Sequence, residues 1–108
     1  MRMWDLPTEY ICDQHLLGEH VEHHMFVGCL EKGKNIQGYL DGGLFNPAKI
    51  VKRHNDLVIE MVKRGMNHKS DINIPYSAIL PSVPLDLKRN MEDLKNRCAK
   101  CRKRIEGN

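Results

Sequence analysis

The residues best suited to chemistry crowd one short stretch of the chain, between positions 15 and 24. Histidine and glutamate dominate it, and both side chains serve in proton transfer, in substrate contact or as metal ligands. His20 and His24 would share one face of a helix, which is a workable spacing for two metal ligands. The stretch nevertheless lacks the HExxH pattern of zinc proteases. Proton transfer or substrate contact is therefore the favoured role for this group, which comprises His15, Glu19, His20, Glu22, His23 and His24.

The cysteines offer a second kind of chemistry. Cys98 and Cys101 form a C-x-x-C pair, which is half of a zinc site. Cys12 and Cys29 are 17 residues apart and form no second pair. Both C-terminal cysteines also fall on an apolar helical stripe, where a thiol behaves as a small core group. Core packing is therefore favoured, a metal or redox role is the alternative, and no metal or cofactor is expected.

The chain's own α-amino group is a further candidate nucleophile. Only four serine and threonine residues are present, which makes a hydroxyl nucleophile a poor candidate. An α-amino group has a pKa of about 7.7–8.0, against about 10.4 for lysine, so a useful fraction is unprotonated at neutral pH. A neighbouring cation such as Arg2 disfavours the charged form further. Such an amine can form a Schiff base, although a chain terminus is usually inert.

Helices are the elements that must position these groups, since the sequence shows no convincing strand. The first helix is predicted to begin near Thr8, a suitable N-cap, and to run to about Lys32. The second is predicted over about 47–64, with Asn46 as the N-cap and Pro47 as the first helical residue.

A third helix carries the most regular apolar pattern. It is predicted to begin near Pro84 or Leu85, with apolar residues spaced 4, 3, 4, 3 and 4 apart as far as Ile105. Segments 34–46 and 66–83 are predicted to be loops. The sequence therefore predicts an all-α fold of three main helices in one domain over residues 1–108.

Charge gives a weak indication of a nucleic-acid partner. The net charge of +3 proves nothing by itself. Between positions 88 and 104, however, eight lysines and arginines stand against two acids, and such a patch could follow a phosphate backbone. A solvated helix face is the commoner explanation of a charge run.

The lengths of the apolar runs indicate where in the cell the protein is expected. The longest are only a few residues, too short for a membrane-spanning helix, and the first residues show no apolar region of a secretion signal. A cytoplasmic, membrane-free protein with reduced thiols is expected.

Two blocks of the sequence resemble the pyrimidine-dimer DNA glycosylase family, the type represented by phage endonuclease V. The first block is a D-Q-H-L motif followed by two glutamates, and it comprises Asp13-Gln14-His15-Leu16-Leu17, Glu19 and Glu22. The second block ends in K-R-G-x-N, and it comprises Lys52-Arg53, Leu57, Glu60, Lys63-Arg64-Gly65 and Asn67. The resemblance covers roughly the first 30 residues and residues 50–68, and this chain is shorter than the phage enzyme.

The resemblance implies a fold and a mechanism. It implies helices with an N-terminal segment packed between them. It also implies that the α-amine of Met1 attacks C1′ of a damaged nucleotide, displaces the base and leaves an imine, before β-elimination breaks the strand. The essential glutamate of the family falls on Glu22. Arg2 follows Met1 as an arginine follows the first residue in the family, and its bulk disfavours removal of Met1.

The implied partner is double-stranded DNA that contains a lesion, bound by a monomer that flips a base out of the duplex. The candidate DNA-binding side chains are three arginines for phosphate contact, two residues of the first block that line the active site, and two histidines as weaker candidates. In that order they are Arg2, Arg53 and Arg89, Gln14 and His15, and His20 and His54.

Departures from the family leave other functions open. Val21 stands where the phage enzyme has an arginine, and a cysteine-rich basic helix replaces its aromatic C-terminal tail. One alternative is a non-catalytic nucleic-acid-binding module. Another is a small metal-dependent hydrolase that uses His20, His24 and Glu19.

Overall fold

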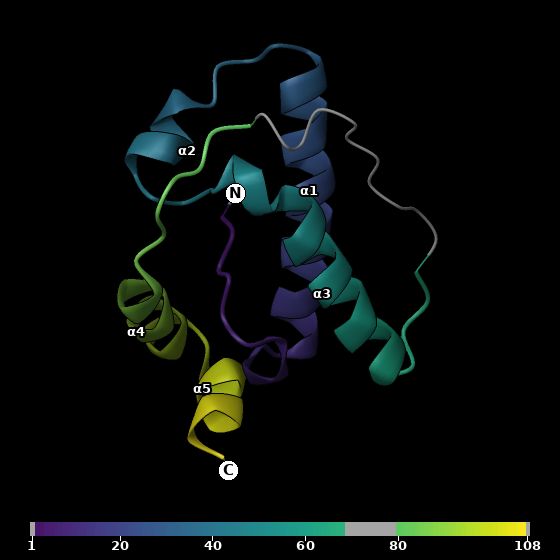
Figure 1. Cartoon of the computed structure of the whole chain (residues 1–108). Helices are drawn as coiled ribbons and strands as arrows, with labels where there is room; N and C mark the ends of the chain where they lie inside the picture. Colours follow the sequence, from purple (N-terminus) through teal and green to yellow (C-terminus); the bar gives the residue numbers. More distant parts are fainter. Residues whose placement is uncertain (1, 69–79, 108) are drawn as a thin grey trace.

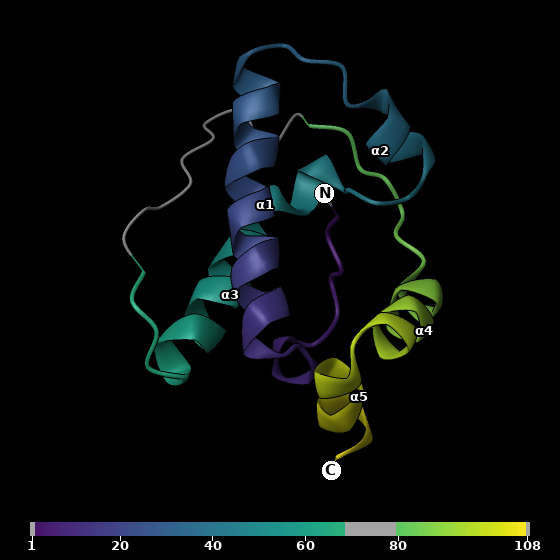
Figure 2. The ribbon, with the colours of Figure 1, turned by 180° about the vertical axis from the view of Figure 1, so that it is seen from behind.

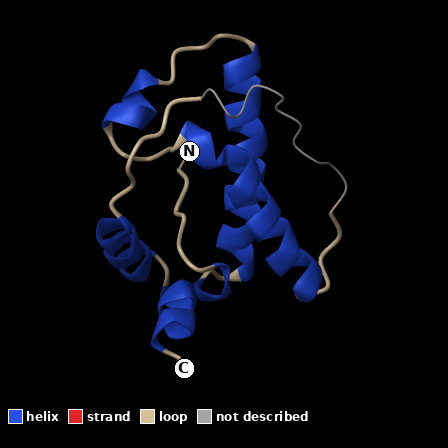
Figure 3. Ribbon diagram, viewed as in Figure 1, coloured by secondary structure: helices blue, strands red, loops and turns tan. Residues whose placement is uncertain are grey.

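The computed structural model describes residues 2–68 and 80–107, and every regular element in these two ranges is a helix (Figures 1 and 3). The all-α prediction is therefore confirmed. In chain order the elements are η1 (Thr8–Tyr10), α1 (Asp13–Glu31), α2 (Gln37–Asp41), η2 (Pro47–Lys49), α3 (Ile50–Lys63), α4 (Leu87–Arg97) and α5 (Ala99–Glu106).

The first long helix begins later than predicted. Thr8 lies in the separate 3-10 turn η1, and α1 begins at Asp13. Between the two helices the backbone of Ile11 is extended, which buries the Ile11 side chain completely. Cys12 is the N-cap of α1, and its Sγ accepts a hydrogen bond from the backbone N–H of His15. The predicted cap at Thr8 is therefore wrong, because burial of Ile11 interrupts the helix.

The second predicted helix is confirmed as η2 followed by α3. The Asn46 side chain accepts a hydrogen bond from the N–H of Ala48, and Pro47 opens the first turn, as the sequence indicated. The apolar side of α3 packs against α1 through the fully buried Ile50 and Leu57.

Two other predictions need correction. The predicted third helix is divided into α4 and α5, because the backbone of Cys98 between them is extended (φ −135°, ψ 109°). The predicted loop 34–46 contains the short helix α2, which was not predicted because Gly38 lies within it and Gly42 and Gly43 follow it. The predicted loop 66–83 is irregular at 66–68 and 80–83, and the remainder lies outside the described residues.

The N-terminal segment runs through the middle of the fold, between the α1–α3 pair and the α4–α5 pair (Figures 1 and 2). It contributes to both apolar cores: Met3 packs with Phe26 and Phe45, whereas Trp4 and Leu6 join the core between α1, α3 and α4. This placement confirms the N-terminal segment packed between helices. No helix in the described part of the chain has the length and apolar content needed to cross a membrane.

Asn90 of α4 holds this segment by two buried hydrogen bonds. Its amide nitrogen donates to the carbonyl of Trp4 at 2.8 Å, and its amide oxygen accepts from Nη2 of Arg2 at 2.6 Å. Asn90 itself is completely buried. The residue therefore fixes the first residues of the chain against α4.

Replacing Asn90 with alanine should destabilise the protein by roughly 1–3 kcal/mol, because two buried polar groups lose their partner. The emission of Trp4, the one tryptophan in the chain, should shift to longer wavelength as the segment loosens. Urea unfolding followed by tryptophan fluorescence measures both effects. Asn96→Ala, an exposed position on the same helix, is the matched control. An equal loss of stability in the two variants would contradict the assignment.

Candidate active site

Glu22 faces the N-terminal segment from the middle of α1. Its Oε2 accepts a hydrogen bond from the backbone N–H of Arg2 at 3.0 Å. Met1, the predicted nucleophile, lies outside the described residues. Its α-nitrogen is nevertheless only three covalent bonds from the Arg2 nitrogen, a separation of at most about 4 Å. Covalent geometry therefore keeps that amine within about 7 Å of the Glu22 carboxylate, whatever the conformation of Met1.

Two adjoining hollows open beside this carboxylate and share Trp4, His15 and Glu22 as lining residues. One has a volume of about 380 Å³ and is also lined by Arg2, Leu44 and Arg97. The other, of about 280 Å³, is also lined by Gln14, Gly18 and Glu19. The structure thus brings Gln14, His15 and Glu22 together around one recess, as the sequence predicted.

The Arg2 side chain is not available for the phosphate contact predicted for it. Its Nη2 pairs with Asp93 at 2.9 Å and bonds Asn90, and its guanidinium lies 4.1 Å from the centre of the Trp4 ring. The hydrogen bond from Arg2 lowers the pKa of the Asp93 carboxyl. The Arg2 side chain therefore anchors this residue to α4, which holds its backbone N–H beside Glu22.

Arg53 is also withdrawn from the surface, contrary to the predicted phosphate contact. It forms a two-pronged ion pair with Glu19, with Nε 2.6 Å from Oε2 and Nη2 3.0 Å from Oε1. Its Nη1 donates to the carbonyl of Leu6 at 2.7 Å. The three residues are buried, so this contact joins α1, α3 and the N-terminal segment.

His20 and His54, the weaker DNA-binding candidates, lie inside the molecule. His20 is 9% exposed and His54 is fully buried, and their Nε2 atoms are 3.1 Å apart. Burial lowers the pKa of His20 to about 4, with neighbouring imidazoles acting in the same direction. Together with His24 and His68 they form a cluster with all four ligand nitrogens within 4.8 Å of one another. The predicted DNA contact by these two residues does not fit their burial.

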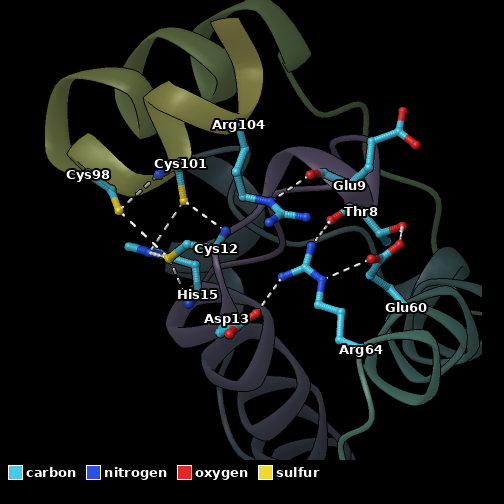
Figure 4. Close-up of polar contacts among 10 residues, drawn as sticks. All are labelled: Thr8, Glu9, Cys12, Asp13, His15, Glu60, Arg64, Cys98, Cys101 and Arg104. Carbon is cyan, nitrogen blue, oxygen red and sulfur yellow. Dashed lines mark hydrogen bonds and ion pairs between the residues drawn. The ribbon is translucent and has the colours of Figure 1, made fainter. Parts of the chain in front are cut away.

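Three cysteines and His15 form a second such cluster, whose ligand atoms also lie within 4.8 Å of one another (Figure 4). Cys101 is buried in the apolar core and Cys98 packs against that core, as the sequence predicted, and Cys12 is buried in the same core. Cys98 and Cys101, for which the sequence showed no second pair of ligands, lie beside Cys12 and His15, a pairing that was not predicted. The C-x-x-H spacing of Cys12 and His15 was the sequence signal that could have revealed it.

Two exposed arginines of α4 are candidates for phosphate contact, and one of them lines the recess. Arg89 is exposed, and its Nη2 donates to the carbonyl of Gly42 at 2.8 Å. Arg97 is exposed at the rim of the larger hollow, 5.8 Å from the centre of the Trp4 ring. Sequence analysis placed Arg97 in the basic run but did not single it out. Gln14 also lines a further recess of about 570 Å³. The other residues that line this recess include three cations of α5, namely Lys100, Lys103 and Arg104.

Replacing Arg53 with alanine should destabilise the protein by roughly 3–5 kcal/mol, because Glu19 would remain buried without its counter-charge. Lys52→Ala is the matched control, since Lys52 pairs with Asp56 in solvent and its loss should leave the urea midpoint unchanged. The urea midpoints of both variants measure the difference. A wild-type midpoint for Arg53→Ala would contradict the structural role of the ion pair.

The two sequence blocks meet in the structure. Asp13 of the first block pairs with Arg64 of the second at 2.9 Å, and Glu19 pairs with Arg53 in the same way. The family model described as pyrimidine dimer DNA glycosylase matches residues 1–74, which include both blocks. No curated protein and no solved structure matches the chain. With more than half of its 108 residues in that match, the chain belongs to the pyrimidine dimer DNA glycosylase family.

Proposed function

We propose that this protein removes a damaged pyrimidine base from double-stranded DNA and then cuts the strand at the resulting abasic site. The α-amine of Met1 is the nucleophile and Glu22 is the assisting carboxylate. The observation that carries the proposal is the 3.0 Å hydrogen bond from the Arg2 backbone N–H to Glu22, at the edge of a recess. Family membership supplies the substrate class.

The chemistry requires an amine and a carboxylate. The unprotonated amine attacks C1′ of the damaged nucleotide as the bond from C1′ to the base breaks, and the electron pair leaves with the base, which takes up a proton. Loss of a proton from the amine and opening of the sugar ring give an imine. Removal of a proton from C2′ then expels the 3′ phosphate by β-elimination.

Glu22 can serve all three of these steps. Its negative charge stabilises the cationic sugar, and its carboxylate can accept protons from the amine and from C2′. The Arg2 N–H occupies one carboxylate oxygen, so the second oxygen can meet the substrate. Trp4, Gln14 and His15 form the walls that would receive the nucleotide.

We propose that the residues that contact the DNA phosphates differ from those predicted from the sequence. Since Arg53 is held in a buried ion pair and the buried Arg2 is paired with Asp93, the exposed Arg89 and Arg97 take their place at the phosphates. The cations of α5 extend this basic surface beyond the recess. Base flipping would bring the reacting sugar into the recess at a cost of a few kcal/mol, which is smallest where a lesion has weakened stacking.

Borohydride should trap a covalent complex between the untagged protein and a duplex with an abasic site or a pyrimidine dimer, because it reduces the imine to a stable amine. Denaturing electrophoresis detects the complex. A protein that carries a tag before Met1 is the control and should give no complex, since its amine is no longer in place. A protein that binds DNA equally well with or without damage and is never trapped would instead be a non-catalytic binding module.

Replacing Glu22 with glutamine should slow strand cleavage by roughly 10²–10⁴-fold, the usual contribution of a general acid–base group. DNA affinity should change little, because the side chain keeps its shape. Single-turnover cleavage and a binding titration separate the two effects. Glu92→Gln, an exposed position on α4, should cleave at the wild-type rate. Full activity in Glu22→Gln would remove this residue from the mechanism.

Replacing Arg97 with alanine should weaken binding to damaged and undamaged duplexes to the same extent. The slope of log affinity against log salt concentration should fall by about 1, as expected for one lost phosphate contact. Titrations at several salt concentrations measure it. Lys34→Ala, which removes an exposed charge beyond the end of α1, should leave the slope unchanged. An unchanged slope in Arg97→Ala would contradict the assigned contact.

A further inference from the structure

We infer that Cys12, His15, Cys98 and Cys101 bind a structural zinc ion. The four ligand atoms converge where the start of α5 meets the start of α1 (Figure 4). The distance from Cys12 Sγ to Cys98 Sγ is 3.8 Å, and His15 Nδ1 lies 3.4 Å from Cys12 Sγ and 3.6 Å from Cys101 Sγ.

These distances are those of a tetrahedral zinc shell. With Zn–S bonds of about 2.3 Å and Zn–N bonds of about 2.0–2.1 Å, tetrahedral angles separate two sulfurs by about 3.8 Å and a sulfur from a nitrogen by about 3.5 Å. The three distances given above agree with these values, and the other three of the six pairs lie within 4.8 Å. Three thiolates and one imidazole are a standard donor set for structural zinc.

The two halves of the site are built alike. Cys12 caps α1 and Cys98 caps α5, and in each case the second ligand follows three residues later in the first helical turn. Cys12 Sγ accepts from the His15 N–H, and Cys98 Sγ accepts from the Cys101 N–H at 3.4 Å. Cys101 Sγ in turn accepts from the Cys12 N–H at 3.2 Å. Each sulfur therefore receives a backbone hydrogen bond, the kind of outer-shell contact that supports a metal-bound thiolate.

The surrounding charge is on balance positive. Three thiolates around Zn²⁺ leave one net negative charge, and the recess beside Cys12 is lined by one acid, Asp13, and by three cations, Lys100, Lys103 and Arg104. Arg104 also bonds the carbonyl of Glu9, which fixes α5 to η1 at 2.8 Å. Four protein ligands fill the tetrahedron, so the ion would hold structure and leave no position for a substrate.

Plain core packing explains less of this arrangement. Buried thiols need only apolar neighbours, yet here an imidazole nitrogen points at two sulfurs inside the core. Cys29, the remaining cysteine, stands apart from the cluster. The zinc ion would join α5, which lies beyond the residues matched by the family model, to the helix that carries Glu22. It would also fix His15, which lines the recess next to Glu22.

The four-histidine cluster carries a second, separate inference: we propose that it holds another zinc ion. His20 and His24 come from adjacent turns of α1, His54 from α3 and His68 from the segment after α3. Their ring centres lie 4.8–5.4 Å apart in the pairs that touch.

This second ion would also be structural and not hydrolytic. Four imidazoles complete a tetrahedral shell and leave no site for a catalytic water. Glu19, the acid considered for a metal-dependent hydrolase, is held by both of its oxygens in the ion pair with Arg53. Neither zinc site depends on the glycosylase activity, so the two can be tested apart from it.

The test is the zinc content of the untagged full-length protein, purified under reducing conditions and measured by elemental analysis and native mass spectrometry. Two zinc ions per chain are expected. Cys98→Ser with Cys101→Ser should lose one of them, and His24→Gln with His68→Gln should lose the other, so each double variant is the control for the other site. Cys29→Ser should keep both.

X-ray absorption spectroscopy at the zinc edge identifies the ligands in the wild-type protein. The inference can therefore be tested even if a variant does not fold. Sulfur neighbours at about 2.3 Å and nitrogen neighbours at about 2.0–2.1 Å are expected together. A zinc ion with sulfur neighbours alone or with none, or a protein without zinc, would overturn the cysteine site. A single ion with three sulfurs and one nitrogen would support that site and overturn the histidine site.

Discussion

The hydrogen bond from the Arg2 N–H to Glu22 is the contact around which the fold is arranged. A chain end normally frays, because few contacts hold it. Here residues 2–6 lie inside the molecule, and Met3, Trp4 and Leu6 are each at most 5% exposed. The segment threads between two helical pairs (Figure 1). A protein that uses its own terminus in catalysis needs such a frame, since an amine can attack only where it is held.

Two ion pairs hold the N-terminal segment in place, and they account for the burial of Arg2 and Arg53. Arg2 reaches α4 through Asp93, and Arg53 joins α1 to α3 through Glu19 while it holds the carbonyl of Leu6. A charge in the interior is tolerated only with its partner in place, so each pair fixes the register of the elements that it joins. The proposed DNA contacts are therefore made by exposed cations of α4 and α5.

The features that could be predicted from the sequence are those that depend on residues close together in the chain. The Asn46–Pro47 cap, the apolar face of α3 and the family membership were all readable from local spacing. The break at Cys98 was not, because a regular apolar stripe runs through it. The Glu19–Arg53 pair joins positions 34 residues apart, and the Cys12–Cys98 contact spans 86. Such contacts depend on how the helices pack, which local spacing does not report.

The central claim is that the first nitrogen of the chain forms the bond to DNA beside Glu22. Tandem mass spectrometry of the borohydride-reduced protein–DNA complex, after digestion of both polymers, identifies the atom that carries the sugar remnant. The amine mechanism predicts that the remnant is found on the N-terminal peptide, attached to the α-nitrogen of Met1. A remnant on a lysine side chain, with the N-terminal peptide unmodified, would contradict it.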